Sequence, residues 1–137
     1  MRIILFAPIL LSFLELSAQK DIDAYKLPQG NFAPQIYVNG VRQVDVISLK
    51  SLREYGMQVV LDDKSFKAIQ FDFGFDCHSR SFFGFSWKRY YGDKLLPLDA
   101  KIKSRVWVGD IIVISGVVIT RGKEYYVMKD KGLKVID

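Results

Sequence analysis

Alternation of apolar and polar residues is the feature that most restricts the fold of this chain. Residues 66–75 place Ile69, Phe71, Phe73 and Phe75 at every second position. Successive side chains of a strand point to opposite faces, so this period of two predicts a strand with one face in a core. Burying each phenylalanine would contribute on the order of 2 kcal/mol before entropy is counted.

Several other segments also have the character of β-structure. Residues 111–120 are almost continuously apolar and predict a long central strand, in which Gly116 indicates a bulge or a bend. Asn39-Gly40 lies between two β-prone runs and predicts a hairpin, because both turn residues must adopt positive φ. Turn signals recur along the chain, and together they predict an all-β domain of about seven or eight short strands, a sandwich or a partly open barrel.

One stretch changes to the period of a helix. Leu49 and Leu52 are spaced for one helical face, and Ser48 precedes them as an N-cap. Gly56 suits the left-handed residue that ends a helix. We expect one short helix of about two turns here, packed over an end of a sheet.

Residues 1–18 are predicted to be a signal peptide. Arg2 gives a positive start, and residues 3–14 are apolar over a length typical of export but too short for a membrane span. Ala18 supplies a small residue for cleavage, although a neighbouring site would also serve; an uncleaved N-terminal anchor is the alternative. We therefore expect an exported protein, periplasmic or secreted, with no stable membrane span in its mature form.

The remaining chain is expected to hold one domain. Residues 19–34 are polar, contain Pro28 and Pro34, and are expected to form a loosely ordered arm. Residues 35–137 are then a single β domain, of the usual domain size. The only cysteine is Cys77, so no intramolecular disulfide can form.

The chain is basic, with a formal net charge of +5 and a pI near 9.3. Its lysines and arginines are scattered beside turns or alternate with apolar residues, which favours solvated strand faces and loop tips. Attraction to an anionic envelope surface is the alternative. Export argues against nucleic acid as a partner.

Three short motifs follow one another along the chain: residues 47–57 (ISLKSLREYGM), residues 71–73 (FDF) and residues 109–114 (GDIIVI). In this order they resemble the C-terminal domain of the GldM family of gliding-motility proteins. The first motif resembles a stretch near the start of that domain, the second a strand that follows it, and the third a Gly-Asp pair that opens an apolar strand. Residues 123–136 would match the final hairpin of the family domain.

This resemblance covers about residues 35–137 and implies an immunoglobulin-like β-sandwich in an envelope protein of Bacteroidota. In the family protein, the domain lies at the end of a periplasmic shaft that engages the type IX secretion and gliding machinery. The present sequence has a predicted signal peptide where the family has a membrane anchor, and it is expected to lack the long periplasmic region. The motor role and the functional residues of the family are therefore not carried over.

Catalysis and metal binding find little support in the sequence. The single histidine, His78, adjoins Cys77, and neighbours on a strand point to opposite sides. One histidine and one cysteine cannot supply the three or four ligands that zinc takes. Asp62 and Asp63 suit a turn, and Asp72 suits the outer side of a strand. No catalytic, cofactor or metal site is predicted, and the chain is not expected to be an enzyme.

The aromatic run over residues 82–91 is the one candidate ligand surface. Tyrosine and tryptophan beside lysine and arginine are typical of protein interfaces and of sugar-stacking platforms. The interaction candidates are Phe82, Trp87, Tyr90 and Tyr91. Core packing is the competing interpretation, with Phe83, Phe85 and Trp87 turned inward and Phe82, Tyr90 and Tyr91 at the rim.

The sequence thus favours a non-catalytic, exported interaction domain that binds other envelope or secreted proteins, through a sheet edge or the aromatic loops. It could be an accessory to gliding or type IX secretion machinery. The alternative is a carbohydrate-binding module that uses Tyr90, Tyr91 or Trp107 as its platform.

Overall fold

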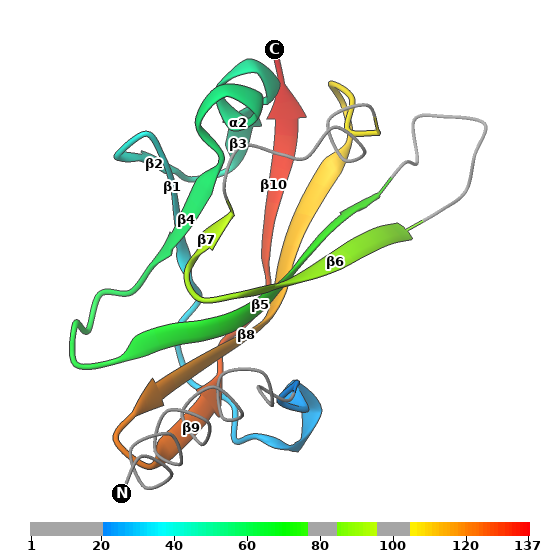
Figure 1. The fold of residues 1–137 in the computed structure, drawn as a ribbon. Helices are drawn as coiled ribbons and strands as arrows, with labels where there is room; N and C mark the ends of the chain where they lie inside the picture. Colours follow the sequence, from blue (N-terminus) through cyan, green and yellow to red (C-terminus); the bar gives the residue numbers. More distant parts are fainter. Residues whose placement is uncertain (1–20, 77–84, 96–104) are drawn as a thin grey trace, which may run out of the picture.

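The computed structural model describes residues 21–76, 85–95 and 105–137. These form a sandwich of two β-sheets with one short α-helix, which confirms the expected all-β fold (Figure 1). The predicted signal peptide lies outside the described residues, and so do Cys77, His78 and Phe82.

The smaller sheet has four antiparallel strands in the order β2-β1-β4-β7. They are β1 (Gln35–Val38), β2 (Val41–Gln43), β4 (Met57–Val60) and β7 (Lys94–Leu95). The hairpin from β1 to β2 turns at Asn39 and Gly40, whose φ values are +49° and +76°, and this confirms the predicted Asn-Gly turn.

The larger sheet has six strands in the order β3-β10-β8-β5-β6, with β9 also paired to β8. They are β3 (Val46–Ser48), β5 (Lys67–Asp76), β6 (Phe85–Tyr91), β8 (Ile111–Arg121), β9 (Glu124–Val127) and β10 (Lys131–Ile136). The pair β3–β10 is parallel, and the other pairs are antiparallel.

The core lies between the two sheets. Phe71, Phe73 and Phe75 of β5 are buried, as their alternation predicted, and Ile112 and Ile114 of β8 are buried with them. The same apolar cluster includes residues of β1 and β4, so the inner faces of both sheets share one core. The central position of β8 is confirmed, because it pairs with β5, β9 and β10.

Gly116 produces the predicted bulge in β8. Ser115 pairs with Asp72, but the next pair is Val118 with Gln70, so two residues of β8 face one of β5. Gly116 has a φ of +54°, a conformation that costs other residues about 1–2 kcal/mol.

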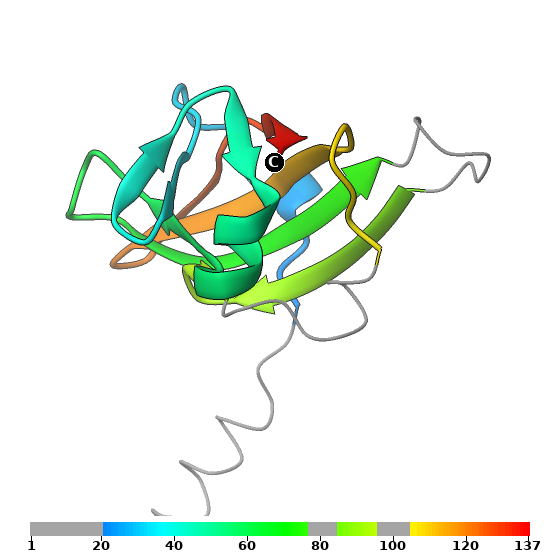
Figure 2. The same cartoon turned by 90° about the horizontal axis from the view of Figure 1, so that it is seen from above.

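The helix α2 (Leu49–Tyr55) begins and ends where the sequence predicts. Ser51 donates its backbone N–H to Ser48 Oγ at 3.2 Å, and Gly56 donates to the Leu52 carbonyl at 2.8 Å. Leu49 and Leu52 are buried, and seen from above the helix covers one end of the sandwich (Figure 2).

Two details differ from expectation. The described residues form ten strands, whereas about seven or eight were predicted. The prediction is too low because strands such as β3 and β7 are too short to show alternation.

The prediction of a closing hairpin over residues 123–136 is wrong. β9 and β10 are both antiparallel to β8, along different parts of its length, so they run in the same direction and cannot pair as a hairpin.

The arm expected to be loosely ordered is instead packed on the larger sheet over residues 21–34. It contains a 3-10 helix, η1 (Ala24–Lys26), and Ala24 is buried. Gly30 donates its N–H to the Val127 carbonyl at 2.8 Å, and Val127 donates to the Pro28 carbonyl at 3.0 Å. The arm therefore continues the sheet beyond β9, an outcome that its polar composition does not indicate.

Candidate interaction surface

The outward face of the six-stranded sheet carries the features that bear on function. The phenylalanines of β5 point into the core, so the residues between them point away from it. Their register then assigns this face across the sheet: Asp72 pairs with Arg89 of β6 and Ser115 of β8, whereas Gly74 pairs with Trp87 and Val113. The arm divides this face into two parts.

The covered half lies beneath the arm and is polar. Ile22 donates its backbone N–H to Gln70 Oε1 at 3.0 Å, and Gln70 Nε2 donates to the Ile22 carbonyl at 2.9 Å. Gln70 is only 2% exposed, so these reciprocal bonds satisfy a buried amide that would otherwise cost about 1–3 kcal/mol. A polar side chain is tolerated here because the arm provides its partner.

Arg89 joins the sheet to the arm. Its Nε and Nη2 atoms donate to the two oxygens of Asp72 at 2.8 and 3.1 Å, and its Nη1 lies 3.4 Å from Asp21 Oδ2. The hydrogen bond to Asp72 raises the pKa of Arg89 above its ordinary value. Tyr91 donates its hydroxyl to Asp21, and this bond raises the pKa of Tyr91 above 10. Asp21 is thus held by two residues of β6.

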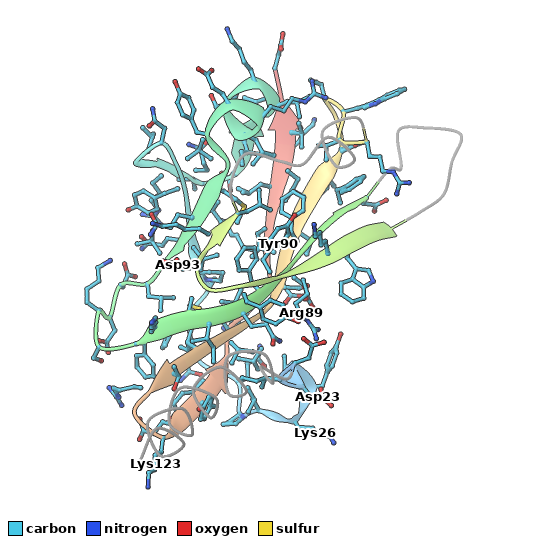
Figure 3. All side chains as sticks on the ribbon, viewed as in Figure 1. Asp23, Lys26, Arg89, Tyr90, Asp93 and Lys123 are labelled. Carbon is cyan, nitrogen blue, oxygen red and sulfur yellow. The ribbon has the colours of Figure 1, made fainter. Side chains whose placement is uncertain are left out.

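A hollow of about 660 Å³ lies between η1 and the sheet. Figure 3 shows Arg89 on β6 and, below it, the segment that carries Asp23 and Lys26. The hollow has both apolar and polar walls. Its lining includes Ile22, Leu27, Val113, Met128, Asp23, Gln29, Asp72, Arg89, Ser115 and Asp130.

The open half lies beyond the arm and is mostly apolar, although Lys134 and Asp76, which both pair with Ile111, also belong to this face. Its apolar residues are Val46, Trp87, Ile111, Val113 and Ile136. Four of these side chains are between 39% and 59% exposed, and Val113 is half-buried. Large apolar side chains gathered on an exposed sheet face are the unusual observation, since single exposed ones are common.

Strand register places these side chains side by side. Lys134 of β10 pairs with both Val46 and Ile111, so one lysine separates the two aliphatic groups. In the next row Val113 pairs with Gly74 and Gly132, which add no side chains to the surface. The open half is therefore low in relief, with the Trp87 indole on the strand beyond Gly74.

The interaction candidates fall in different places. Trp87 is 59% exposed, so its assignment to the core is wrong. Tyr90, expected at the rim, is half-buried and stacked on Phe71 with ring centroids 5.5 Å apart. Tyr91 is 50% exposed, as expected. Phe82 lies outside the described residues.

The three residues proposed as alternative sugar platforms, Tyr90, Tyr91 and Trp107, do not lie together. Tyr90 turns inward, and the other two are exposed but lie near opposite ends of β8. Tyr91 pairs with Gln70, itself paired with Val118, whereas Trp107 belongs to the turn before Ile111. The sequence also did not indicate Val46 and Ile136 as members of this surface, because a single valine on an edge strand and a single isoleucine at the end of a strand form no pattern.

The carboxylates that might have served catalysis have structural partners. Asp72 is bound by Arg89, and Asp63 accepts from the backbone and hydroxyl of Ser65 at 2.9 and 2.6 Å. These bonds lower the pKa of Asp63 and confirm the turn that was predicted there. Among the described residues no group of three or more His, Cys, Asp or Glu is placed to hold a metal ion. No helix in that part of the chain could cross a membrane.

The chain matches no known protein-family model and no curated protein. The described residues therefore define the class of protein by its fold alone. It is an all-β sandwich whose larger sheet has one polar, covered half and one mostly apolar, open half.

Proposed function

We propose that this chain is a non-catalytic, exported interaction domain and that a partner protein of the cell envelope, or a secreted protein, docks on the open half. The observation that carries this proposal is the set of exposed apolar side chains on one sheet face, Val46, Trp87, Ile111 and Ile136.

Physical reasoning favours a protein as the partner. The open half has low relief, because glycines flank Val113 on both neighbouring strands, and a flat apolar surface suits another folded surface better than a small ligand. Tryptophan is among the residues that most often dominate binding energy when a partner covers them. Lys134, between Val46 and Ile111, would contribute a polar contact and fix orientation.

Export is supported by residues 1–18, with their positive start, apolar run and small residue at Ala18. The resemblance to the GldM C-terminal domain supports envelope machinery of the gliding or type IX secretion kind as the source of the partner. The resemblance contributes no functional residue, so the docking surface proposed here depends only on the described side chains.

Crosslinking in intact cells of the source organism, with a tagged chain and mass spectrometry of the captured proteins, tests the proposal. We expect one reproducible envelope partner with the natural sequence. Trp87→Ala and Ile111→Lys should each reduce its recovery about tenfold or more, as for central interface residues. Tyr125→Ala is the matched control, because Tyr125 is an exposed aromatic residue of β9 outside the open half.

Equal recovery of the partner with Trp87→Ala, Ile111→Lys and Tyr125→Ala would contradict the docking surface. Capture of secretion or gliding components would assign the chain to that machinery, whereas capture of other envelope proteins would leave the interaction role without it. Recovery of a precursor that keeps residues 1–18 would contradict the proposed signal peptide.

A further inference from the structure

The hollow beneath η1 adjoins the open half and shares Val113 with it. We propose that it binds an uncharged oligosaccharide. This inference goes beyond the docking of a protein partner and does not depend on it. The volume of about 660 Å³ lies within the range of small-molecule sites.

The polar groups of the hollow are fixed by one another. Arg89 holds both oxygens of Asp72 and approaches Asp21, so these groups are oriented before any ligand arrives. Each carboxylate oxygen can accept more than one hydrogen bond, and Gln29 and Ser115 add groups that both donate and accept. Sugar hydroxyls also both donate and accept, so they can use such a mixed set of fixed partners.

The charges of the hollow argue against an ionic ligand. An anion would meet four carboxylates, those of Asp21, Asp23, Asp72 and Asp130, against one guanidinium. At three of these carboxylates a cation would have to compete with existing partners. Arg89 already binds Asp72 and Asp21, and Lys26 lies 3.9 Å from Asp23. A neutral ligand displaces none of these ion pairs.

Apolar and aromatic groups complete a surface suited to a sugar ring. Ile22, Leu27 and Met128 form apolar walls, against which the C–H faces of a pyranose can pack. Tyr25 is the aromatic residue that lines the hollow, and its side chain is fully exposed to solvent. Tyrosine offers an apolar face and a polar hydroxyl, which matches the two sides of a saccharide.

Calorimetric titration of the full mature chain with cellotetraose, N-acetylchitotetraose and laminaritetraose is the test. We expect saturable binding of at least one of them. Asp130→Ala and Ser115→Leu should each weaken that binding about tenfold, the first by removing an acceptor and the second by filling the hollow. Asp45→Ala removes a carboxylate outside the hollow and should change nothing.

Fluorescence of single-tryptophan variants gives an independent readout, because the chain has only Trp87 and Trp107. The Arg89 guanidinium lies 5.7 Å from the Trp87 ring, so a ligand that touches Arg89 should change Trp87 emission in Trp107→Phe. The same ligand should leave Trp107 emission unchanged in Trp87→Phe.

No saturable binding of these sugars at millimolar concentration would overturn the proposal. Binding of tetralysine that depends on Asp130 would also overturn it, because the hollow would then recognise a cation. Neither result would affect capture of a protein partner through Ile111, so the two proposals can fail separately.

Discussion

The two halves of the outward sheet face reverse the usual distribution of residues. In the covered half, polar side chains such as Gln70 and Asp72 lie beneath the arm, and each has a hydrogen-bonding partner. In the open half, Ile111 and Trp87 are apolar and face solvent. Burying a polar group without a partner is costly, and so is exposing a large apolar patch. In the covered half the polar groups find hydrogen-bonding partners within the chain, whereas the apolar side chains of the open half remain exposed.

This difference predicts different effects of substitution on stability. Changes to the hydrogen-bonded groups of the covered half should reduce stability, because these groups already have their partners. Changes in the open half should leave stability nearly unchanged and affect only what the surface binds. Four experiments test this comparison, from the largest expected effect to the smallest.

Arg89→Ala should cause the largest loss. It leaves Asp72, whose side chain is 20% exposed, without its bidentate partner and removes the link to Asp21, which should cost about 2–4 kcal/mol of unfolding free energy. Trp87→Ala, in the open half, should cost no more than about 1 kcal/mol. Urea unfolding of both variants measures the difference, and equal losses would contradict the division into two halves.

Gly116→Ala should lower the free energy of unfolding by about 2 kcal/mol. The alanine would have to keep a φ of +54°, and its Cβ would lie 3.3 Å from Asp72 Oδ2 and 3.7 Å from Ala24 Cβ, so it would crowd the arm. Gly122→Ala is the matched control, because its φ is +61° but the space around it is open, and about 1 kcal/mol is expected. Denaturant midpoints compare the pair; a larger loss at Gly122 would show that crowding at the arm is unimportant.

Gln70→Leu keeps the size of the side chain but removes both hydrogen bonds to Ile22. We expect a loss of about 1–2 kcal/mol and faster proteolysis within residues 21–34. Gln43→Leu removes an exposed bond to the Val41 carbonyl and should cost less than about 0.5 kcal/mol. Limited proteolysis with mass spectrometry locates the cuts, and unchanged cleavage of the arm would mean that Gln70 does not hold it.

Alkaline pH should loosen the link between Tyr91 and Asp21. The hydrogen bond to Asp21 raises the pKa of Tyr91 in the folded chain, so the folded state holds this proton more tightly than the unfolded state. The stabilisation is therefore complete below pH 10 and is lost as pH rises through the raised pKa. Tyrosinate absorbance of the natural chain and of Asp21→Asn measures this, and the variant should titrate at lower pH. Identical titrations would exclude the bond.

Much of the fold follows from local sequence. The alternation at Phe71 and Phe73 defines β5, and the Asn39-Gly40 pair defines the first hairpin, because both depend on backbone preferences of neighbouring residues. The cap at Ser48 is equally local, since its bond to Ser51 spans three residues. Such features can be identified without knowing what surrounds them.

The inward and outward sides of β6 could not be determined in this way. Aromatic and basic residues follow one another through Trp87, Lys88, Arg89, Tyr90 and Tyr91, so either parity leaves aromatic groups on both faces. Pairing with β5 decides the matter: Tyr90 lies opposite Phe71 and shares its core-facing side, whereas Trp87 lies opposite Gly74 and faces outward. A shift of one residue would exchange the two.

The sequence by itself determined the all-β class, the Asn39-Gly40 turn, the helix α2 and the bulge at Gly116, because each depends on residues close together in the chain. Only the tertiary structure decided which half of the larger sheet is covered. The contacts that fix the arm join Ile22 to Gln70 across 48 positions and Asp21 to Tyr91 across 70. Partners so distant leave no local pattern in the sequence, because the two residues of each contact come together only when the chain folds.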